Sequence, residues 1–425
     1  AACCLLSKTS EAVFDHCRIS TWRSLIGFSV TQRSRPVIRS CDIVNSKCGI
    51  HIKDSAAPQI ENNCIHDCQT VGLRAGDASQ GTCDSNKIFN CLESGAVASG
   101  QSEISFSNNE LSDTGSCGFL LSEQTKARIV SNKIFGSHIN GIQAGDDSDP
   151  FVSMNKIVGS QGSGIIIHDR ARGFFARNEV QGSHLAGVGV RDDAAPTFNE
   201  NVVHKGVGSG LVLLGQAGGV YESNVISHNR CAGVGFKNRA CALFDGNIIS
   251  FNEGYGVWMQ DDAAGTFQNN MIEGNQLTGF SVNDGAAPTV VKNTIKDGKQ
   301  VGVQLQHRAR GHYWGNTIRG NESVNVLLAG ESAAVLENNT ISGSAGGGVL
   351  IRGSSACHFR GNTVERNGRA NLAVLDQADP VVEGNLIQEG SGRGVVVTGG
   401  GRGRFHGNRI LGHRLAGGYV GGQAA

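Results

Sequence analysis

Proline, tryptophan and methionine are scarce in this chain of 425 residues, with 6, 3 and 3 copies, and aromatic residues make up only 6%. No stretch keeps apolar residues at the spacing of an amphipathic helix, so a helical fold is excluded. No apolar run approaches the roughly 20 residues that a membrane-spanning helix needs, and we expect no membrane insertion. The formal net charge is zero, which gives non-specific binding to nucleic acid no electrostatic support. We therefore expect no nucleic-acid partner.

Motifs for cofactors are missing as well. Glycine-rich stretches such as residues 399–403 lack the following helix that a phosphate-binding loop requires. Cys64, His66 and Cys68 lie close together in the sequence, but on a strand that leads into a turn their side chains need not converge. A second pair at zinc-finger spacing is also missing. We expect no cofactor and no metal site.

What the chain does contain is a repeat. An asparagine returns every 23 residues without insertion or deletion, and an aliphatic residue follows two positions after each one. A fixed period of this length over nearly the whole chain is typical of a solenoid. The repeated asparagines are Asn63, Asn86, Asn109, Asn132, Asn155, Asn178, Asn201, Asn224, Asn247, Asn270, Asn293, Asn316, Asn339, Asn362, Asn385 and Asn408.

The rest of the period predicts strands and turns. Nine residues after the asparagine stands a glycine, replaced by Asn325 and Asn371 in two coils, and we expect a left-handed backbone there. Apolar residues then alternate, and twenty residues after the asparagine comes a third apolar column. The pattern predicts an all-β fold, a right-handed parallel β-helix of about 17–18 coils with three short strands per coil. The asparagines are expected to form an internal amide ladder, in particular Asn132, Asn155, Asn178, Asn201, Asn224, Asn247, Asn270 and Asn293.

The unbroken register predicts a single domain. In this interpretation residues 41–425 form a continuous parallel β-helix, and residues 1–40 form irregular N-terminal coils of the same domain. Cys17 and Cys41 are expected to occupy the asparagine position in these first coils.

The turn before each asparagine alternates in charge from coil to coil, acidic in one and basic in the next. Opposite charges on adjacent coils relieve repulsion along the stack, and this structural interpretation is preferred. The alternative is a charged stripe that binds a partner. Its candidate residues are Arg170, Arg172, Asp192, Asp193, Arg308 and Arg310.

Carboxylates recur nine residues before the asparagine, as at Asp54, Asp169 and Asp284. An acidic column can bind Ca²⁺ or supply a general base. However, an aspartate after a strand also caps the following turn, and recurrence favours that structural role over catalysis. For an enzyme acting on an acidic polysaccharide, the candidate catalytic residues are the pairs Asp146 and Asp147, Asp192 and Asp193, and Asp261 and Asp262.

Cysteine is present in 13 copies, an odd number, and ten of them precede residue 118. Several fall in strand columns, and Cys68 and Cys91 share one phase on successive coils. A secreted disulfide framework would not distribute thiols in this way. We expect mostly reduced thiols and an intracellular location, cytoplasmic or nuclear, with secretion left open if the chain is a processed fragment.

The unit N-x-I-x(6)-G-[VI]-x-[VI], as in residues 293–303, resembles the carbohydrate-binding and sugar-hydrolase (CASH, PbH1) β-helix repeat family. The closest likeness is to the β-helix region of F-box proteins, which are substrate receptors of cullin–RING ubiquitin ligases. The resemblance covers residues 40–415 approximately and implies a β-helix fold. F-box helices and a zinc-binding recognition module are not visible, so a ligase role would require segments outside this chain.

Polysaccharide lyases and epimerases with this fold tend to interrupt their coils with long loops that wall a cleft, whereas this register is unbroken. The sequence therefore favours a protein-binding scaffold without catalytic activity. It would be the substrate-recognition part of a ubiquitin-ligase-type receptor or a structural component of a large assembly, with partner proteins along one lateral face. The alternative is a carbohydrate-active enzyme, a lyase, epimerase or hydrolase, that uses the paired aspartates.

Overall fold

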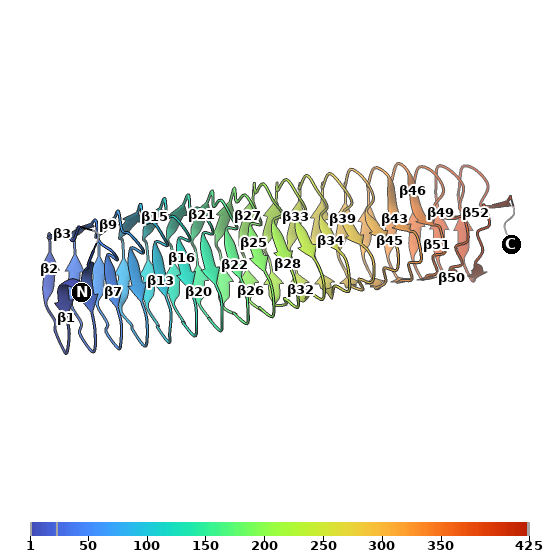
Figure 1. The fold of residues 1–425 in the computed structure, drawn as a ribbon. Helices are drawn as coiled ribbons and strands as arrows, with labels where there is room; N and C mark the ends of the chain where they lie inside the picture. Colours follow the sequence, from blue (N-terminus) through green and yellow to red (C-terminus); the bar gives the residue numbers. More distant parts are fainter. Residues whose placement is uncertain (1, 23, 423–425) are drawn as a thin grey trace. The chain divides into compact units, whose positions relative to one another are not determined.

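A computed structural model of the protein describes residues 2–22 and 24–422. The chain forms two compact units, unit 1 (Ala1–Gly208) and unit 2 (Ser209–Ala425). Within each unit, every strand pairs in parallel with the strand three places further along the chain (Figure 1). Each coil therefore contributes one strand to each of three sheets, A, B and C. The predicted all-β solenoid, with about 18 coils of roughly 23 residues and three parallel sheets, is confirmed.

Unit 1 contains strands β1 to β27. Sheet A consists of β1 (Ala2–Leu6), β4 (Ile26–Val30), β7 (Ile50–Ile52), β10 (Leu73–Ala75), β13 (Ala96–Ala98), β16 (Phe119–Leu121), β19 (Ile142–Ala144), β22 (Ile165–Ile167) and β25 (Val188–Val190). Sheet B consists of β2 (Val13–Asp15), β5 (Val37–Arg39), β8 (Gln59–Glu61), β11 (Thr82–Asp84), β14 (Ser105–Ser107), β17 (Arg128–Val130), β20 (Phe151–Ser153), β23 (Phe174–Ala176) and β26 (Thr197–Asn199). Sheet C consists of β3 (Arg18–Ser20), β6 (Asp42–Val44), β9 (Cys64–His66), β12 (Lys87–Phe89), β15 (Glu110–Ser112), β18 (Lys133–Phe135), β21 (Lys156–Val158), β24 (Glu179–Gln181) and β27 (Val202–His204).

Unit 2 contains strands β28 to β55. Sheet A consists of β28 (Leu211–Leu213), β31 (Val234–Phe236), β34 (Val257–Met259), β37 (Phe280–Val282), β40 (Val303–Leu305), β43 (Val324–Leu328), β46 (Gly347–Ile351), β49 (Leu372–Val374), β52 (Val395–Thr398) and β55 (Gly418–Gly421). Sheet B consists of β29 (Val220–Glu222), β32 (Cys241–Asp245), β35 (Ala264–Gln268), β38 (Thr289–Val291), β41 (His312–Trp314), β44 (Val335–Glu337), β47 (His358–Arg360), β50 (Val381–Glu383) and β53 (Arg404–His406). Sheet C consists of β30 (Val225–Ser227), β33 (Ile248–Ser250), β36 (Met271–Glu273), β39 (Thr294–Lys296), β42 (Thr317–Arg319), β45 (Thr340–Ser342), β48 (Thr363–Glu365), β51 (Leu386–Gln388) and β54 (Arg409–Leu411).

Each coil turns at three corners, and one residue at each corner has a left-handed backbone. Around Asn132 these residues are Ser131, Gly136 and Asp146, with φ of 57°, 59° and 56°. Three bends leave only short strands between them. Along these strands the side chains alternate between the interior and the surface, so the repeated apolar columns fill the core.

The expected left-handed backbone at the glycine column, including Asn325 and Asn371, is wrong. None of these positions is among the described residues with positive φ. At Gly141 the reason for glycine is steric, because a Cβ there would lie 2.3 Å from Ile157 Cγ2 and 2.5 Å from the Gly164 carbonyl oxygen. Asn325 and Asn371 are fully buried, and their amides accept hydrogen bonds from neighbouring buried amides; the Asn321 Nδ2 donates to Asn325 Oδ1 at 2.8 Å.

The repeated asparagines stack in one buried column within each unit. In unit 1, Asn132 Nδ2 donates to Asn155 Oδ1 at 3.0 Å and Asn155 Nδ2 to Asn178 Oδ1 at 2.9 Å. Each Oδ1 also accepts the backbone N–H of the preceding asparagine. Unit 2 repeats the pattern, with Asn247 Nδ2 donating to Asn270 Oδ1 at 2.9 Å. The buried amides are therefore hydrogen-bonded, which offsets the cost of removing them from water.

A second inner column stands five residues after the asparagine. In unit 1 its members are Cys68, Cys91, Thr114, Ser137, Ser160 and Ser183, all buried. In unit 2 it includes Asn229, Asn252, Asn275, Asn321, Ser344 and Asn367, also buried. Asn229 Nδ2 donates to Asn252 Oδ1, and Asn252 Nδ2 to Asn275 Oδ1, both at 3.0 Å.

Proline and glycine alternate at the start of sheet B for a steric reason. Gly173 follows Pro150 by one coil and has φ of +111°. A Cβ at Gly173 would lie 2.7 Å from the Pro150 carbonyl oxygen and 2.9 Å from its Cδ. Gly311 stands in the same relation to Pro288, with a distance of 2.5 Å to the carbonyl oxygen. In these coils the proline leaves room only for glycine in the next coil, whereas in the first coils Pro58 follows Pro36 directly.

The first coils differ in length from the rest. Arg18 pairs with Asp42 and Asp42 pairs with Cys64, so these two coils hold 24 and 22 residues. Cys41 takes the asparagine position, and its backbone N–H donates to Asn63 Oδ1 at 2.9 Å. Residues 2–22 and 24–422 include no helix with the length and apolarity of a membrane-crossing segment.

Candidate functional site

The first aspartate of each predicted catalytic pair caps a turn. Asp146 and Asp261 have left-handed backbones, and so does Asp192. The Asp146 carboxylate accepts the backbone N–H of Glu123 at 2.8 Å, and Asp261 accepts that of Asn238 at 3.0 Å. Asp192 accepts the N–H of Asp169 at 3.3 Å. These carboxylates therefore hold the corner of one coil to the corner of the next.

The second aspartates and the arginines lie exposed in the same turns. Arg170 Nε and Nη2 donate to the two oxygens of Asp147, both at 2.7 Å, one coil apart. These hydrogen bonds lower the pKa of Asp147. The structure brings Arg170 and Asp147 together and places the other unit 1 candidates in the same turn of successive coils, but the candidates divide between the two units and do not form one site. The exposed residues are Asp146, Asp147, Arg170, Arg172, Asp192, Asp193, Asp262, Arg308 and Arg310, while Asp261 is half-buried.

A cluster that the sequence analysis missed lies on the outer face of sheet B in unit 2. It consists of His312 and Trp314 on β41, Glu337 on β44, and His358 and Arg360 on β47. The register pairs Trp314 with Glu337 and Glu337 with Arg360, so the three side chains follow one another on adjacent strands. His312 and His358 occupy the same strand position two coils apart.

Glu337 is the centre of this cluster. Its Oε2 lies 3.2 Å from His312 Nε2, and its Oε1 accepts a hydrogen bond from Arg360 Nη2. Its side chain is only 18% exposed, whereas those of His312 and Arg360 are 47% and 64% exposed. Burial opposes ionisation of Glu337, but the hydrogen bonds from His312 and Arg360 outweigh it and lower the pKa of the carboxyl. Glu337 is therefore a carboxylate that fixes an imidazole and a guanidinium.

The surface around this cluster is hollowed. Glu337, His358, Arg360 and Glu383 line a groove of about 290 Å³. The Trp314 ring lies next to it on β41, and the Lys292 ammonium stands 5.4 Å from the ring centroid. Arg310, a residue of the predicted charged stripe, precedes β41 by two positions. The Trp314 ring, the His312 and His358 imidazoles and the Arg360 guanidinium thus lie on the outer face of sheet B, on strands β41 and β47.

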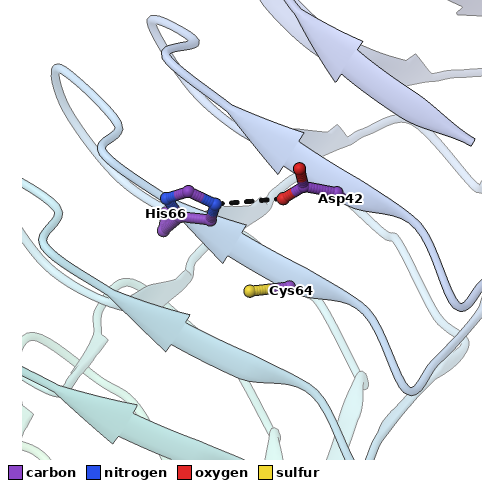
Figure 2. A group of neighbouring side chains, drawn as sticks. All are labelled: Asp42, Cys64 and His66. Atoms are coloured by element: carbon purple, nitrogen blue, oxygen red, sulfur yellow. Dashed lines mark hydrogen bonds and ion pairs between the residues drawn. The ribbon is translucent and has the colours of Figure 1, made fainter.

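A different group of side chains gathers on sheet C of unit 1 (Figure 2). Asp42 starts β6, and Cys64 and His66 lie on the neighbouring strand β9. The His66 Nε2 lies 3.0 Å from Asp42 Oδ1, and one ligand atom from each of Asp42, Cys64 and His66 lies within 4.8 Å of the others. Burial and the nearby Asp42 carboxylate raise the pKa of the Cys64 thiol. Cys68 is fully buried, so the sequence motif contributes only Cys64 and His66 to this group.

A second group in unit 1 contains His168, Asp169 and Asp192, again within 4.8 Å of one another. Its atoms already have protein partners. The His168 Nδ1 lies 2.7 Å from Asp169 Oδ2, and Gln143 Nε2 lies 3.0 Å from His168 Nε2. Both aspartates also cap backbone N–H groups.

The outer face of sheet A in unit 2 carries an apolar groove of about 400 Å³. Val324, Leu350, Ala373 and Val396 line it, with Arg369 among its polar lining residues. Val324 and Leu350 also pack against Leu327. The groove has an apolar floor and no cluster of titratable groups among its described lining residues.

Comparisons with known proteins concern the fold. The profile of the right-handed β-helix region matches residues 2–157, 140–294, 186–334 and 279–425. No curated protein matches the chain. Among solved structures, the A-module of the Azotobacter vinelandii mannuronan C-5 epimerase AlgE4 has 15% identity and a TM-score of 0.42, with 92% of this chain and 91% of that one covered. The PL6 family alginate lyase AlyGC has 8% identity and a TM-score of 0.39, with 100% and 96% covered. The Dettilon tailspike protein has 12% identity and a TM-score of 0.32, with 86% and 62% covered. Likeness at these levels concerns the fold alone.

Proposed function

The chain belongs to the right-handed β-helix family, and we propose that it is a carbohydrate-active member that holds an anionic polysaccharide across sheet B of unit 2. The observation that carries the proposal is the Glu337 carboxylate, which fixes His312 on one side and Arg360 on the other. This arrangement differs from the repeated corner carboxylates, because it occurs beside a groove and combines an acid, a base and a cation.

The three groups suit a polymer of acidic sugars. A guanidinium pairs with carboxylates through charge-assisted hydrogen bonds, so Arg360 supplies positive charge for a uronate. Trp314 presents a ring to the apolar face of a sugar. Parallel strands one coil apart would place successive binding groups about 4.8 Å from each other along the polymer.

His312 is the candidate acid–base group. Imidazole changes its charge near neutral pH, and a carboxylate bound to one ring nitrogen orients the other for proton transfer. Glu337 provides that orientation through Nε2. In a lyase or an epimerase on uronates, the proton next to the sugar carboxyl moves to a base, and Arg360 would stabilise the negative charge that develops on the carboxyl group.

The proposal is tested with uronate polymers, with and without Ca²⁺, and a neutral glucan as the control polymer. Binding is measured by affinity electrophoresis, lyase activity by the absorbance of the new double bond, and epimerisation by NMR. We expect Arg360→Ala to weaken binding and His312→Ala to abolish turnover while binding persists. Arg170→Ala in unit 1 serves as the control. A wild-type chain that neither binds nor converts any uronate polymer contradicts the proposal.

A second candidate function is supported by the apolar groove on sheet A of unit 2. We propose in this case a scaffold that binds an extended, apolar segment of a partner protein, as a ubiquitin-ligase-type receptor or a component of a large assembly would. Buried thiols such as Cys48, Cys83 and Cys357 fit the intracellular location expected for it, and alkylation under non-reducing conditions tests whether most cysteines are thiols.

The scaffold proposal predicts that a charge in the groove disrupts partner binding. Leu350→Asp should remove proteins that co-purify with the wild type, whereas Leu120→Asp, on sheet A of unit 1, should retain them. Quantitative mass spectrometry of the purified complexes provides the measurement. Equal recovery with both variants would contradict a role for the groove.

A further inference from the structure

We propose that Asp42, Cys64 and His66 form a binding site for a zinc ion on sheet C of unit 1 (Figure 2). This site belongs to unit 1, whereas the proposed carbohydrate site belongs to unit 2, and the zinc proposal does not depend on the carbohydrate proposal. The sequence predicted no metal here, because the local motif offers only Cys64, His66 and Cys68 as ligands. In the structure the third candidate ligand is Asp42 on the adjacent strand β6, and not Cys68.

The donor atoms select the class of metal. A thiolate sulfur, an imidazole nitrogen and a carboxylate oxygen are the ligands that Zn²⁺ takes in proteins, whereas Ca²⁺ and Mg²⁺ require oxygen ligands. Ligand atoms around one tetrahedral zinc ion lie roughly 3.3–3.8 Å apart, given bond lengths of about 2.0–2.3 Å. The three atoms here lie within 4.8 Å of one another, so small side-chain rotations bring them to one ion. Three protein ligands leave one position for water.

The surroundings of His66 add an independent observation. Its Nδ1 lies 2.7 Å from Asp67 Oδ2, while its Nε2 lies 3.0 Å from Asp42 Oδ1. Both partners are acceptors and a neutral imidazole has one N–H, so when Nδ1–H donates to Asp67 the lone pair of Nε2 faces Asp42, and a metal ion there would be bound by both. A carboxylate on the far nitrogen of a ligating histidine is the usual way to fix the tautomer and the ring orientation. Asp67 holds that place.

Packing holds the imidazole in position. The Phe89 ring of the next coil stacks on His66 with centroids 4.8 Å apart and planes 3° from parallel. Arg18 Nε lies 3.3 Å from Asp42 Oδ2. The other carboxylate oxygen, Oδ1, faces His66 and is the one that would bind the ion. The His66 and Asp42 side chains are 19% and 39% exposed, which gives an ion access from solvent.

The second cluster in unit 1 provides a matched comparison. His168 resembles His66 in its contact with the following aspartate, but Gln143 already contacts its other nitrogen. No thiol belongs to that cluster. The zinc proposal therefore applies to His66 and not to His168, and His168→Ala is the control variant.

The test uses the full chain, stripped of metal with a chelator, and titrates it with Zn²⁺ and with Co²⁺ as a spectroscopic probe. We expect one high-affinity ion per chain that is lost in Cys64→Ser and in His66→Ala and is retained in His168→Ala. The thiolate-to-Co²⁺ charge-transfer band should disappear in Cys64→Ser. Asp67→Asn should weaken binding about 10–100-fold, because it changes only the orientation of His66. Equal zinc binding by the wild type, Cys64→Ser and His66→Ala would overturn the proposal.

A second measurement does not depend on the folding of variants. Bound Zn²⁺ should slow the alkylation of Cys64 in the wild-type chain about tenfold or more, because a ligating sulfur is no longer available to the reagent. The exposed Cys3 should react at nearly the same rate with and without zinc. Peptide mapping by mass spectrometry reads both sites in one sample. Unchanged reactivity of Cys64 at saturating zinc contradicts the site.

Discussion

The inner column five residues after the repeated asparagine differs between the two units. In unit 2, Asn229, Asn252 and Asn275 form a second amide ladder. In unit 1 the column begins with the thiols Cys68 and Cys91 and continues with short hydroxyls, and among the described residues Ser160 Oγ and Ser183 Oγ are buried without a hydrogen-bond partner. An amide has a donor and an acceptor and spans the roughly 4.8 Å between coils, whereas the serine side chains in this column do not. The same backbone therefore accommodates a column of hydrogen-bonded amides in unit 2 and a column with buried hydroxyls that lack a partner in unit 1.

The largest effect is expected in the asparagine ladder that both units share. Asn155→Ala removes the acceptor for two donors of Asn132, its backbone N–H and its Nδ2. Leaving buried donors unsatisfied should cost about 2–4 kcal/mol. Asn270→Ala in unit 2 should cost a similar amount. Urea denaturation followed by circular dichroism measures both, with the exposed Gln161→Ala as the control. A shift no larger than that of the control in either unit would refute the stabilising role of the ladder.

Substitutions in the inner column five residues after the asparagine should destabilise unit 2 more than unit 1. Asn252→Ser removes the acceptor of Asn229 and should cost about 1–3 kcal/mol. Ser160→Ala in unit 1 removes a hydroxyl that has no partner among the described residues, so its cost should be near zero or negative. The two variants are compared by their denaturation midpoints. Equal destabilisation would mean that the hydroxyl column is as well satisfied as the amide column.

A smaller, pH-dependent effect is expected at Glu337. Because its pKa is lowered in the folded state, the ionised carboxylate contributes stability that is present above the ordinary glutamate pKa. This contribution is lost as pH falls through the folded value. The melting temperature of the wild type should therefore exceed that of Glu337→Gln at pH 7, and the difference should shrink in acid. A difference that stays constant into acid solution argues against the His312 and Arg360 contacts.

The smallest effect is expected at the Arg170 and Asp147 pair, whose side chains are 69% and 45% exposed. Solvent and salt screen such a pair, so Arg170→Ala should change the melting temperature only slightly. The small difference should decrease further at high salt. Melting curves at low and high ionic strength provide the measurement, and a large, salt-independent loss would show that this corner contributes more than its exposure suggests.

The sequence predicted the sheets because each strand repeats its apolar pattern in every coil. It predicted the turn at the recurring aspartates, but not which residue at each corner has a left-handed backbone. Left-handed positions hold aspartate, serine, lysine or arginine as well as glycine, as at Asp146, Lys205 and Arg366, and such a mixture gives no sequence signal. The glycine column, which looked like a corner, reflects close approach of neighbouring coils. A repeat thus shows where side chains point more clearly than where the backbone bends.

The candidate sites could not be predicted for a related reason. Glu337 contacts residues 25 positions before it and 23 after it, and no local motif joins them. At the zinc site, a 23-residue period pairs Cys64 with Cys41, whereas the 22-residue coil pairs it with Asp42. Because this coil is one residue shorter than the 23-residue period, the period alone does not identify Asp42 as the neighbour of Cys64. By contrast, the recurrence of aspartate after a strand predicted a capping role, and Asp146 and Asp261 have that role in the structure.

The proline–glycine contact at the start of sheet B bears on how such a chain grows during evolution. Duplication of one coil that carries proline would place proline on proline, an arrangement that the chain has at Pro36 and Pro58 in its first coils. Duplication of two coils keeps Pro150 under Gly173 and Pro288 under Gly311. A gain or loss of two coils therefore preserves the contact between proline and glycine at Pro150 and at Pro288, whereas a gain or loss of one coil removes it.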